Sequence, residues 1–90
     1  MKDKDTLHLI LSYKWYNMIL NNIKREEYRT IDVWEHRLEN NDFKFVCFHK
    51  GYTNNTMTWA IRCIRHGIGN PEWGAPSHEV YIIELAERIN

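Results

Sequence analysis

Three segments in the second half of the chain carry apolar side chains on both of their faces. They span residues 43–49, 56–66 and 79–86, and turn-forming segments at 51–55 and 67–77 separate them. A strand with two apolar faces needs cover on both sides. In a small β-barrel one face of the sheet fills the lumen, and helices partly cover the other. The pattern therefore predicts a sheet that curls into a small barrel.

The first half of the chain adds shorter elements. The apolar run 7–12 predicts a buried strand. The helical spacing of Trp15 and Ile19 predicts a helix over about residues 13–22. Residues 24–30 favour extended geometry and predict a second, short strand.

A second short helix is expected after this strand. Asp32 is expected to cap it, and Val33, Trp34 and Leu38 are expected to form its buried side. About five strands and two short flanking helices indicate a mixed α+β fold. A chain of this length has room for a single domain over residues 1–90.

The charge balance argues against one class of partner. The chain has 12 Lys and Arg residues and 12 Asp and Glu residues, and the two signs are equally balanced on both sides of residue 46. A protein that binds duplex DNA without sequence preference needs an excess of positive charge. We therefore do not expect that function.

The apolar segments of the chain bear on the oxidation state of its cysteines and on its cellular location. Cys47 and Cys63 both lie in such runs, where isolated cysteines are typically small buried hydrophobes, so reduced thiols are expected. No segment approaches the ~20 apolar residues of a membrane span. The charged first residues are not followed by the apolar core of a secretory signal. We expect no membrane partner and a cytoplasmic location.

Segment 22–29 concentrates charge where the first helix is expected to end. Its first residue is an asparagine, which tolerates the left-handed backbone conformation that ends a helix. In an extended strand Glu27 and Arg29 share one face, and Tyr28 takes the other. Together with Lys24, this arrangement would direct an ammonium, a carboxylate and a guanidinium into one cleft.

The same residues resemble the signature of the ASCH domain family, a branch of the PUA-like superfamily. That signature reads Gly-x-Lys-x-x-Glu-x-Arg after the first helix, and this chain has Asn22, Lys24, Glu27 and Arg29 in the same spacing. Asparagine replaces the glycine and is the next best residue at a positive backbone angle. The loop 69–76 and the Val-Tyr-Ile-Ile strand after it resemble small bacterial and prophage members of the family.

The resemblance implies a PUA-like β-barrel with a cleft beside the first helix and a role in binding RNA or a nucleotide. One branch of the family is similar to amidohydrolases that remove the acetyl group from N4-acetylcytidine. In that branch a lysine at the position of Lys24 works with a threonine at the position of Glu27. Because this chain lacks that threonine, the resemblance implies a non-catalytic binding module first and a small amidohydrolase second. A prophage accessory module that binds other proteins is the third hypothesis.

Lys24, Glu27 and Arg29 are the main candidates for ligand binding. Lys24 would bind phosphate, or act as a general base if desolvation lowers its pKa. Glu27 would accept a hydrogen bond from a base amino group, and Arg29 offers a planar fork for phosphate or carboxylate. The alternative is a set of surface ion pairs, which contribute little to stability when they are exposed.

Four further residues are candidates at the mouth of the same cleft. Ser12 and Lys14 would lie at the N-terminus of the first helix, which attracts anions, and the alternative for Lys14 is a solvated surface lysine. Tyr52 follows a turn glycine and would line the cleft. Trp73 lies in a loop rich in glycine and proline, where it would stack on a base or instead plug one end of the barrel.

Standard metal and cofactor motifs are absent from the sequence. No two histidines lie at i, i+4 on a helix with a carboxylate between them, and there is no Cys-x-x-Cys. There is also no phosphate-binding loop, dinucleotide fingerprint or Gly-x-Ser-x-Gly elbow. We therefore expect no metal and no cofactor, and RNA or a nucleotide as the partner. Whether the chain is an enzyme stays open at this point.

Overall fold

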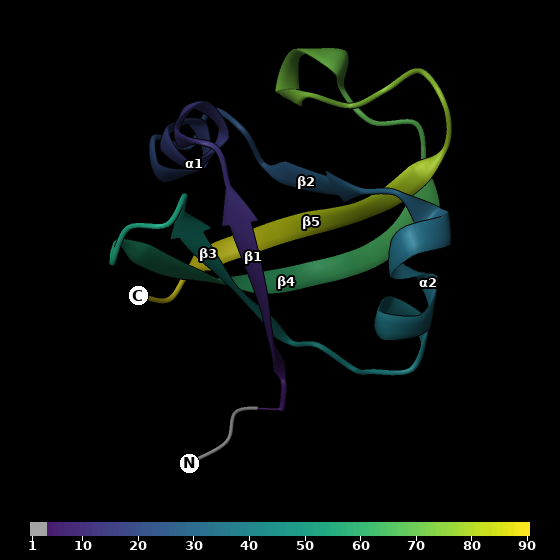
Figure 1. Ribbon diagram of the computed structural model, residues 1–90, viewed down its shortest axis with the longest axis horizontal. Coiled ribbons are helices and arrows are strands. Elements are labelled where there is room, and N and C mark those ends of the chain that lie inside the picture. The colour runs from purple at the N-terminus through teal and green to yellow at the C-terminus, as the bar shows by residue number, and fades with distance from the viewer. Residues whose placement is uncertain (1–3) are drawn as a thin grey trace.

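A curled five-stranded sheet and two helices make up the computed structural model, which describes residues 4–90 (Figure 1). The elements follow the chain in the order β1 (Thr6–Leu11), α1 (Tyr13–Leu20), β2 (Glu26–Arg29), α2 (Ile31–Glu39), β3 (Phe45–Lys50), β4 (Thr56–Gly67), the 3₁₀ turn η1 (Pro71–Trp73) and β5 (Val80–Arg88).

The strand order places β1 and β2 at the two edges of the sheet. The order is β1-β3-β4-β5-β2, with β1 parallel to β3 and the other neighbours antiparallel. The sheet curls until these edges approach each other, because a guanidinium nitrogen of Arg29 on β2 lies 3.4 Å from the carbonyl oxygen of Ile10 on β1. The fold is therefore a half-barrel of mixed α+β composition, which confirms the predicted fold class.

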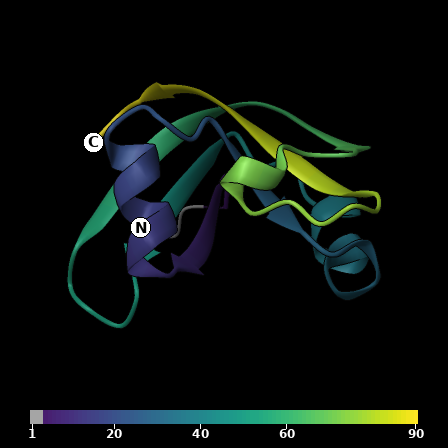
Figure 2. The same cartoon turned by 90° about the horizontal axis from the view of Figure 1, so that it is seen from above.

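The two helices lie at opposite ends of the arch that the strands form (Figure 2). Tyr16 and Ile19 of α1 and Leu38 of α2 enter the core. The buried core comprises Leu7, Leu9, Leu11, Tyr16, Ile19, Leu38, Val46, Phe48, Met57, Trp59, Tyr81, Ile83 and Leu85. Four successive residues at the start of β5 are buried, so this strand has two covered faces, as its sequence predicts.

The first helix ends as predicted, although it is two residues shorter. The amide of Asn21 donates to the carbonyl of Asn17 at 3.0 Å, and Asn22 adopts a φ of 62°. This left-handed residue turns the chain out of α1 and towards β2. Both cysteines are free, as expected.

The second helix differs from its prediction in two respects. Thr30, not Asp32, is the N-cap, because the chain enters α2 directly after β2 ends. The carboxylate of Asp32 lies in the first turn, where it still favours the helix dipole. The prediction that Val33 is buried is wrong, since Val33 is 72% exposed. Only a narrow stripe of α2, which includes Leu38, packs against the core. Successive residues of a helix are rotated by about 100° around its axis, so Val33 lies outside this stripe and faces solvent.

Among residues 4–90, no helix is long enough and apolar enough to cross a membrane.

Candidate functional site

The turn after α1 delivers Lys24 into the interior of the protein. The amides of Ile23 and Lys24 both donate to the carbonyl of Met18, at 2.9 and 3.1 Å. This tight turn, together with the left-handed Asn22, points the Lys24 side chain inwards. Lys24 is only 1% exposed, and a lysine is rarely buried to this extent unless its charge is paired.

β2 then places two further charged side chains beside Lys24. Glu27 and Arg29 alternate with Tyr28, so they share one face of the strand. Glu27 Oε1 lies 3.3 Å from Lys24 Nζ, and Glu27 Oε2 lies 2.9 Å from an Arg29 nitrogen. The structure thus brings together the three main sequence candidates, which we call the charge cluster (Lys24, Glu27 and Arg29).

In the charge cluster two cations, Lys24 and Arg29, pair with the single carboxylate of Glu27. Its three groups are poorly exposed, with side-chain exposures of 1% for Lys24, 9% for Glu27 and 20% for Arg29. Desolvation lowers the pKa of Lys24, and the neighbouring Glu27 carboxylate opposes this effect. With both cations protonated, the cluster has one excess positive charge in a setting where charges are weakly screened.

Arg29 lies at the seam between the two edges of the sheet and has an unused hydrogen-bond donor. One of its guanidinium nitrogens donates to Glu27 and to the carbonyl of Ile10. The guanidinium lies over the ring of Trp34, 5.2 Å from its centroid. Among the buried side-chain nitrogen and oxygen atoms of residues 4–90, only Arg29 Nε lacks a hydrogen-bond partner. Such atoms are rare in folded proteins and call for an explanation.

The 69–75 loop covers Lys24 from the far end of the chain. Lys24 Nζ donates to the carbonyl oxygen of Trp73 at 2.7 Å, across 49 residues of sequence. Gly74 has a φ of 96°, and a Cβ at this position would lie 2.8 Å from the Trp15 ring. The loop backbone therefore approaches the Trp15 ring as closely as a glycine allows.

Tyr28 anchors the other side of the same loop. Its hydroxyl accepts from the amide of Asn70 at 3.0 Å and donates to Glu26 Oε1 at 2.7 Å. Burial, reinforced by the hydrogen bond to Glu26, raises the pKa of the Tyr28 hydroxyl well above its usual value. The hydroxyl therefore keeps the proton that it donates to Glu26 up to a higher pH than an unperturbed tyrosine would.

Aromatic rings flank the cations of the cluster. Lys24 Nζ lies 5.2 Å from the Trp15 ring centroid and 4.7 Å from that of Tyr28. Lys14 Nζ lies 4.6 Å from the same Trp15 ring. Trp15 therefore connects the exposed Lys14 to the buried Lys24.

The remaining sequence candidates lie in different settings. Ser12 is the N-cap of α1 and is exposed, without a hydrogen bond from its side chain to the helix. Trp73 joins the cluster through its backbone carbonyl, and its ring is partly buried. Tyr52 is 95% exposed in the turn between β3 and β4, so its side chain projects into solvent.

Sequence reasoning missed the roles of Trp15 and Trp34, which it assigned to the core. Both are partly buried and pack against the core while one face meets a cation. The neighbouring basic residues Lys14 and Arg37 were a usable signal, since Arg37 follows Trp34 by three residues and lies 5.4 Å from its centroid.

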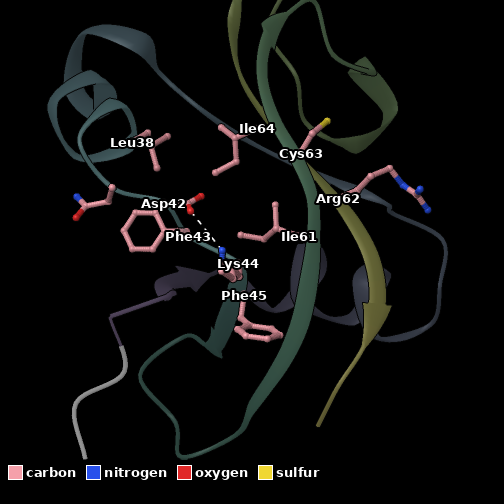
Figure 3. Close-up of a pocket in the computed structure, with 10 residues that line it drawn as sticks. Leu38, Asp42, Phe43, Lys44, Phe45, Ile61, Arg62, Cys63 and Ile64 are labelled. Carbon is pink, nitrogen blue, oxygen red and sulfur yellow. Dashed lines mark hydrogen bonds and ion pairs between the residues drawn. The ribbon is translucent and has the colours of Figure 1, made fainter.

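A cavity of about 590 Å³ lies apart from the charge cluster (Figure 3). Ile61 and Ile64 of β4 point across it towards Phe43, and an ion pair of 3.3 Å between Asp42 and Lys44 lies beside it. None of the seven sequence candidates lines this cavity. It is therefore separate from the candidate site.

Comparison of the chain with known protein families, curated proteins and solved structures finds no match.

Proposed function

We propose that this chain is a non-catalytic module that binds RNA or a nucleotide and holds an anionic group of its ligand at Arg29. The observation that carries the proposal is the buried, unpartnered Nε of Arg29 within a cluster of two cations and one carboxylate. A phosphate that binds at the exposed part of the Arg29 side chain, which is 20% exposed, would balance the excess positive charge. A small rotation of the guanidinium would then bring Nε to a phosphate oxygen as its missing acceptor.

The surroundings of Arg29 support a ligand with aromatic bases. The guanidinium is oriented on one side by Glu27 and on another by the ring of Trp34. A fixed guanidinium loses little entropy when it binds phosphate. A base that displaces the exposed Arg37 from the Trp34 ring would stack there, and such stacking contributes about 1–3 kcal/mol per base in single-strand binders.

The balanced net charge favours RNA or a nucleotide over duplex DNA. A neutral chain gains little from the counterion release that drives non-specific binding to duplex DNA. Recognition of single-stranded RNA depends more on stacking and on contacts to individual groups. The resemblance of residues 22–29 to the ASCH signature supports the same class of ligand.

The arrangement of Lys24 supports binding over the hydrolase alternative. Burial lowers the pKa of Lys24, but the ammonium donates to Trp73 and pairs with Glu27, which both oppose deprotonation. At 1% exposure Lys24 also has no open path to a substrate. A general base must be deprotonated and must reach its substrate. If the protein is a binding module, incubation with N4-acetylcytidine releases no more cytidine than a Lys24→Ala control.

Titration with short single-stranded RNAs and nucleoside monophosphates over a range of salt concentrations tests the proposal. Arg29→Lys keeps the charge and removes the Nε donor and the planar fork. We expect it to weaken binding about tenfold to a hundredfold, the effect of losing charge-assisted hydrogen bonds. Arg62→Lys is the matched control, because Arg62 is 61% exposed and pairs with Glu84 outside the cluster.

Two results would overturn this function. One is the absence of any saturable binding by the wild-type protein. The other is equal binding by wild type and Arg29→Lys, with circular dichroism showing that both are folded. Capture of a protein partner by a chain that binds no RNA or nucleotide would instead favour the accessory-module hypothesis.

A further inference from the structure

Three potential metal ligands lie together on the outer face of the sheet, on β1 and β3. His8 and Cys47 are direct neighbours in the parallel register of these strands, and His49 follows Cys47 on the same face. The alternate residues Leu9 and Phe48 point into the core. One ligand atom from each of His8, Cys47 and His49 lies within 4.8 Å of the others.

Two of the three separations between these atoms are close to those around a tetrahedral metal ion. His8 Nδ1 and His49 Nε2 are 3.0 Å apart, and Cys47 Sγ and His49 Nε2 are 3.8 Å apart. Zinc–nitrogen bonds of about 2.0–2.1 Å and zinc–sulfur bonds of about 2.3 Å imply ligand separations of roughly 3.3 and 3.6 Å in a tetrahedron. Shifts of a few tenths of an ångström would satisfy these two separations, and the third, between His8 and Cys47, is within 4.8 Å and would close further when both bind one ion.

The donor set and its exposure indicate which metal fits. One thiolate and two imidazoles form a borderline-soft set, which suits Zn²⁺ and does not suit Mg²⁺ or Ca²⁺. Cys47 is buried, His49 is partly buried and His8 is exposed, so the cluster opens to solvent on the side of His8. Three protein ligands with a solvent-facing opening leave room for water as the fourth ligand.

We propose that His8, Cys47 and His49 bind one Zn²⁺ per chain, with water in the fourth position. The proposal is independent of the function proposed for the charge cluster, with which this site shares no residue. The ion would replace the contact between the two imidazoles and cross-link β1 to β3. Because the three ligands converge only in the folded chain, zinc binding would stabilise the fold.

Cobalt binding provides the direct test, because Co²⁺ reports its ligands by absorption. The full chain, reduced and freed of metal, is titrated with Co²⁺ and then with Zn²⁺. We expect one Co²⁺ per chain, a thiolate-to-cobalt charge-transfer band, the visible bands of tetrahedral cobalt, and their loss when Zn²⁺ displaces the probe. Zn²⁺ should also raise the midpoint of thermal unfolding.

Variants assign the ligands. Cys47→Ser should abolish the charge-transfer band, and His8→Ala should weaken Zn²⁺ binding by at least about tenfold, as losing even an outer-shell partner does. Cys63→Ser and His78→Ala are the matched controls and should leave both signals unchanged, since neither residue belongs to the cluster.

Several results would overturn the site. They are the absence of a charge-transfer band in the wild type, a band that persists in Cys47→Ser or disappears in Cys63→Ser, and Zn²⁺ affinity unaffected by His8→Ala. His8 is exposed on an edge strand, so the alanine variant keeps the test valid even if Cys47→Ser fails to fold.

Discussion

Glu27 connects the two cations of the charge cluster, one through each carboxylate oxygen. Its removal leaves Lys24 and Arg29 facing each other without compensation, whereas removal of Lys24 leaves Glu27 still paired with Arg29. An unpaired buried charge is far more costly than a buried carbonyl that loses one partner. Removal of Glu27 should therefore lower the free energy of unfolding measurably more than removal of Lys24.

We expect Glu27→Gln to lower the free energy of unfolding by about 3–5 kcal/mol, because it leaves two poorly exposed cations unpaired. Lys24→Met should cost less, about 1–3 kcal/mol, mainly from the lost hydrogen bond to the Trp73 carbonyl. Urea denaturation followed by tryptophan fluorescence measures both. Glu35→Gln, at an exposed position on α2, is the control and should change little. A larger loss for Lys24→Met than for Glu27→Gln would contradict this account of the cluster.

The sequence predicted the grouping of these residues and missed the burial of Lys24. The alternation of Glu27, Tyr28 and Arg29 follows from strand geometry alone, and Asn22 predicted the left-handed turn. The burial of Lys24 depends on the carbonyl of Trp73, 49 residues away. No local pattern contains that contact.

The 69–75 loop is the element that closes the site, and Gly74 sets how closely it approaches. Gly74 combines a positive φ with a contact to Trp15 that leaves no space for a Cβ. Both features require glycine. Gly74 thus determines where the preceding Trp73 carbonyl lies relative to Lys24.

We expect Gly74→Ala to lower the free energy of unfolding by about 1–3 kcal/mol, through backbone strain and displacement of the loop from Trp15. Amides of the loop should exchange hydrogen faster, because the displaced loop loses its hydrogen bonds. Chemical denaturation and hydrogen exchange measure the two effects. Ser77→Ala, exposed on the same connection, should leave both unchanged. Normal stability and exchange in Gly74→Ala would show that the loop is not held in this way.

Pairing between elements marks the limit of sequence reasoning. Alternation and turn residues predicted the five strands and two helices nearly as they are. The parallel pairing of β1 with β3 crosses a helix, a strand and another helix, so periodicity does not reveal it. The cluster of His8, Cys47 and His49 exists only through that pairing. Metal-binding motifs defined by short sequence spacings therefore do not reveal this cluster.

For the whole molecule, the contact between Tyr81 and Glu39 links helix α2 to strand β5 of the sheet. The Tyr81 side chain is buried, and its hydroxyl donates to Glu39 Oε2 at 2.8 Å across 42 residues. Burial, followed by the hydrogen bond to Glu39, raises the pKa of Tyr81 from 10.0 to about 12. In the unfolded chain the hydroxyl loses its proton first.

Stability should therefore fall as pH rises between 10 and 12. In this window the folded state retains the Tyr81 proton and the unfolded state has released it, so higher pH favours unfolding. The contribution of Tyr81 is complete below pH 10 and is lost as pH approaches 12. Urea denaturation across this range should give a shallower decline for Tyr81→Phe than for wild type. Tyr52→Phe is the control, because Tyr52 is 95% exposed. Identical slopes for wild type and Tyr81→Phe would contradict the prediction.

The curl of the whole sheet brings its two edges together at Arg29, and the proposed function depends on that seam. Nuclear magnetic resonance of the Arg29 Nε–H group, assigned by its loss in Arg29→Lys, tests the claim most directly. The account predicts that this resonance shifts saturably as a nucleoside monophosphate or a short single-stranded RNA is added, while the Nε–H resonance of Arg62 stays in place. An Arg29 resonance that does not move, or that moves no more than that of Arg62, would contradict the account.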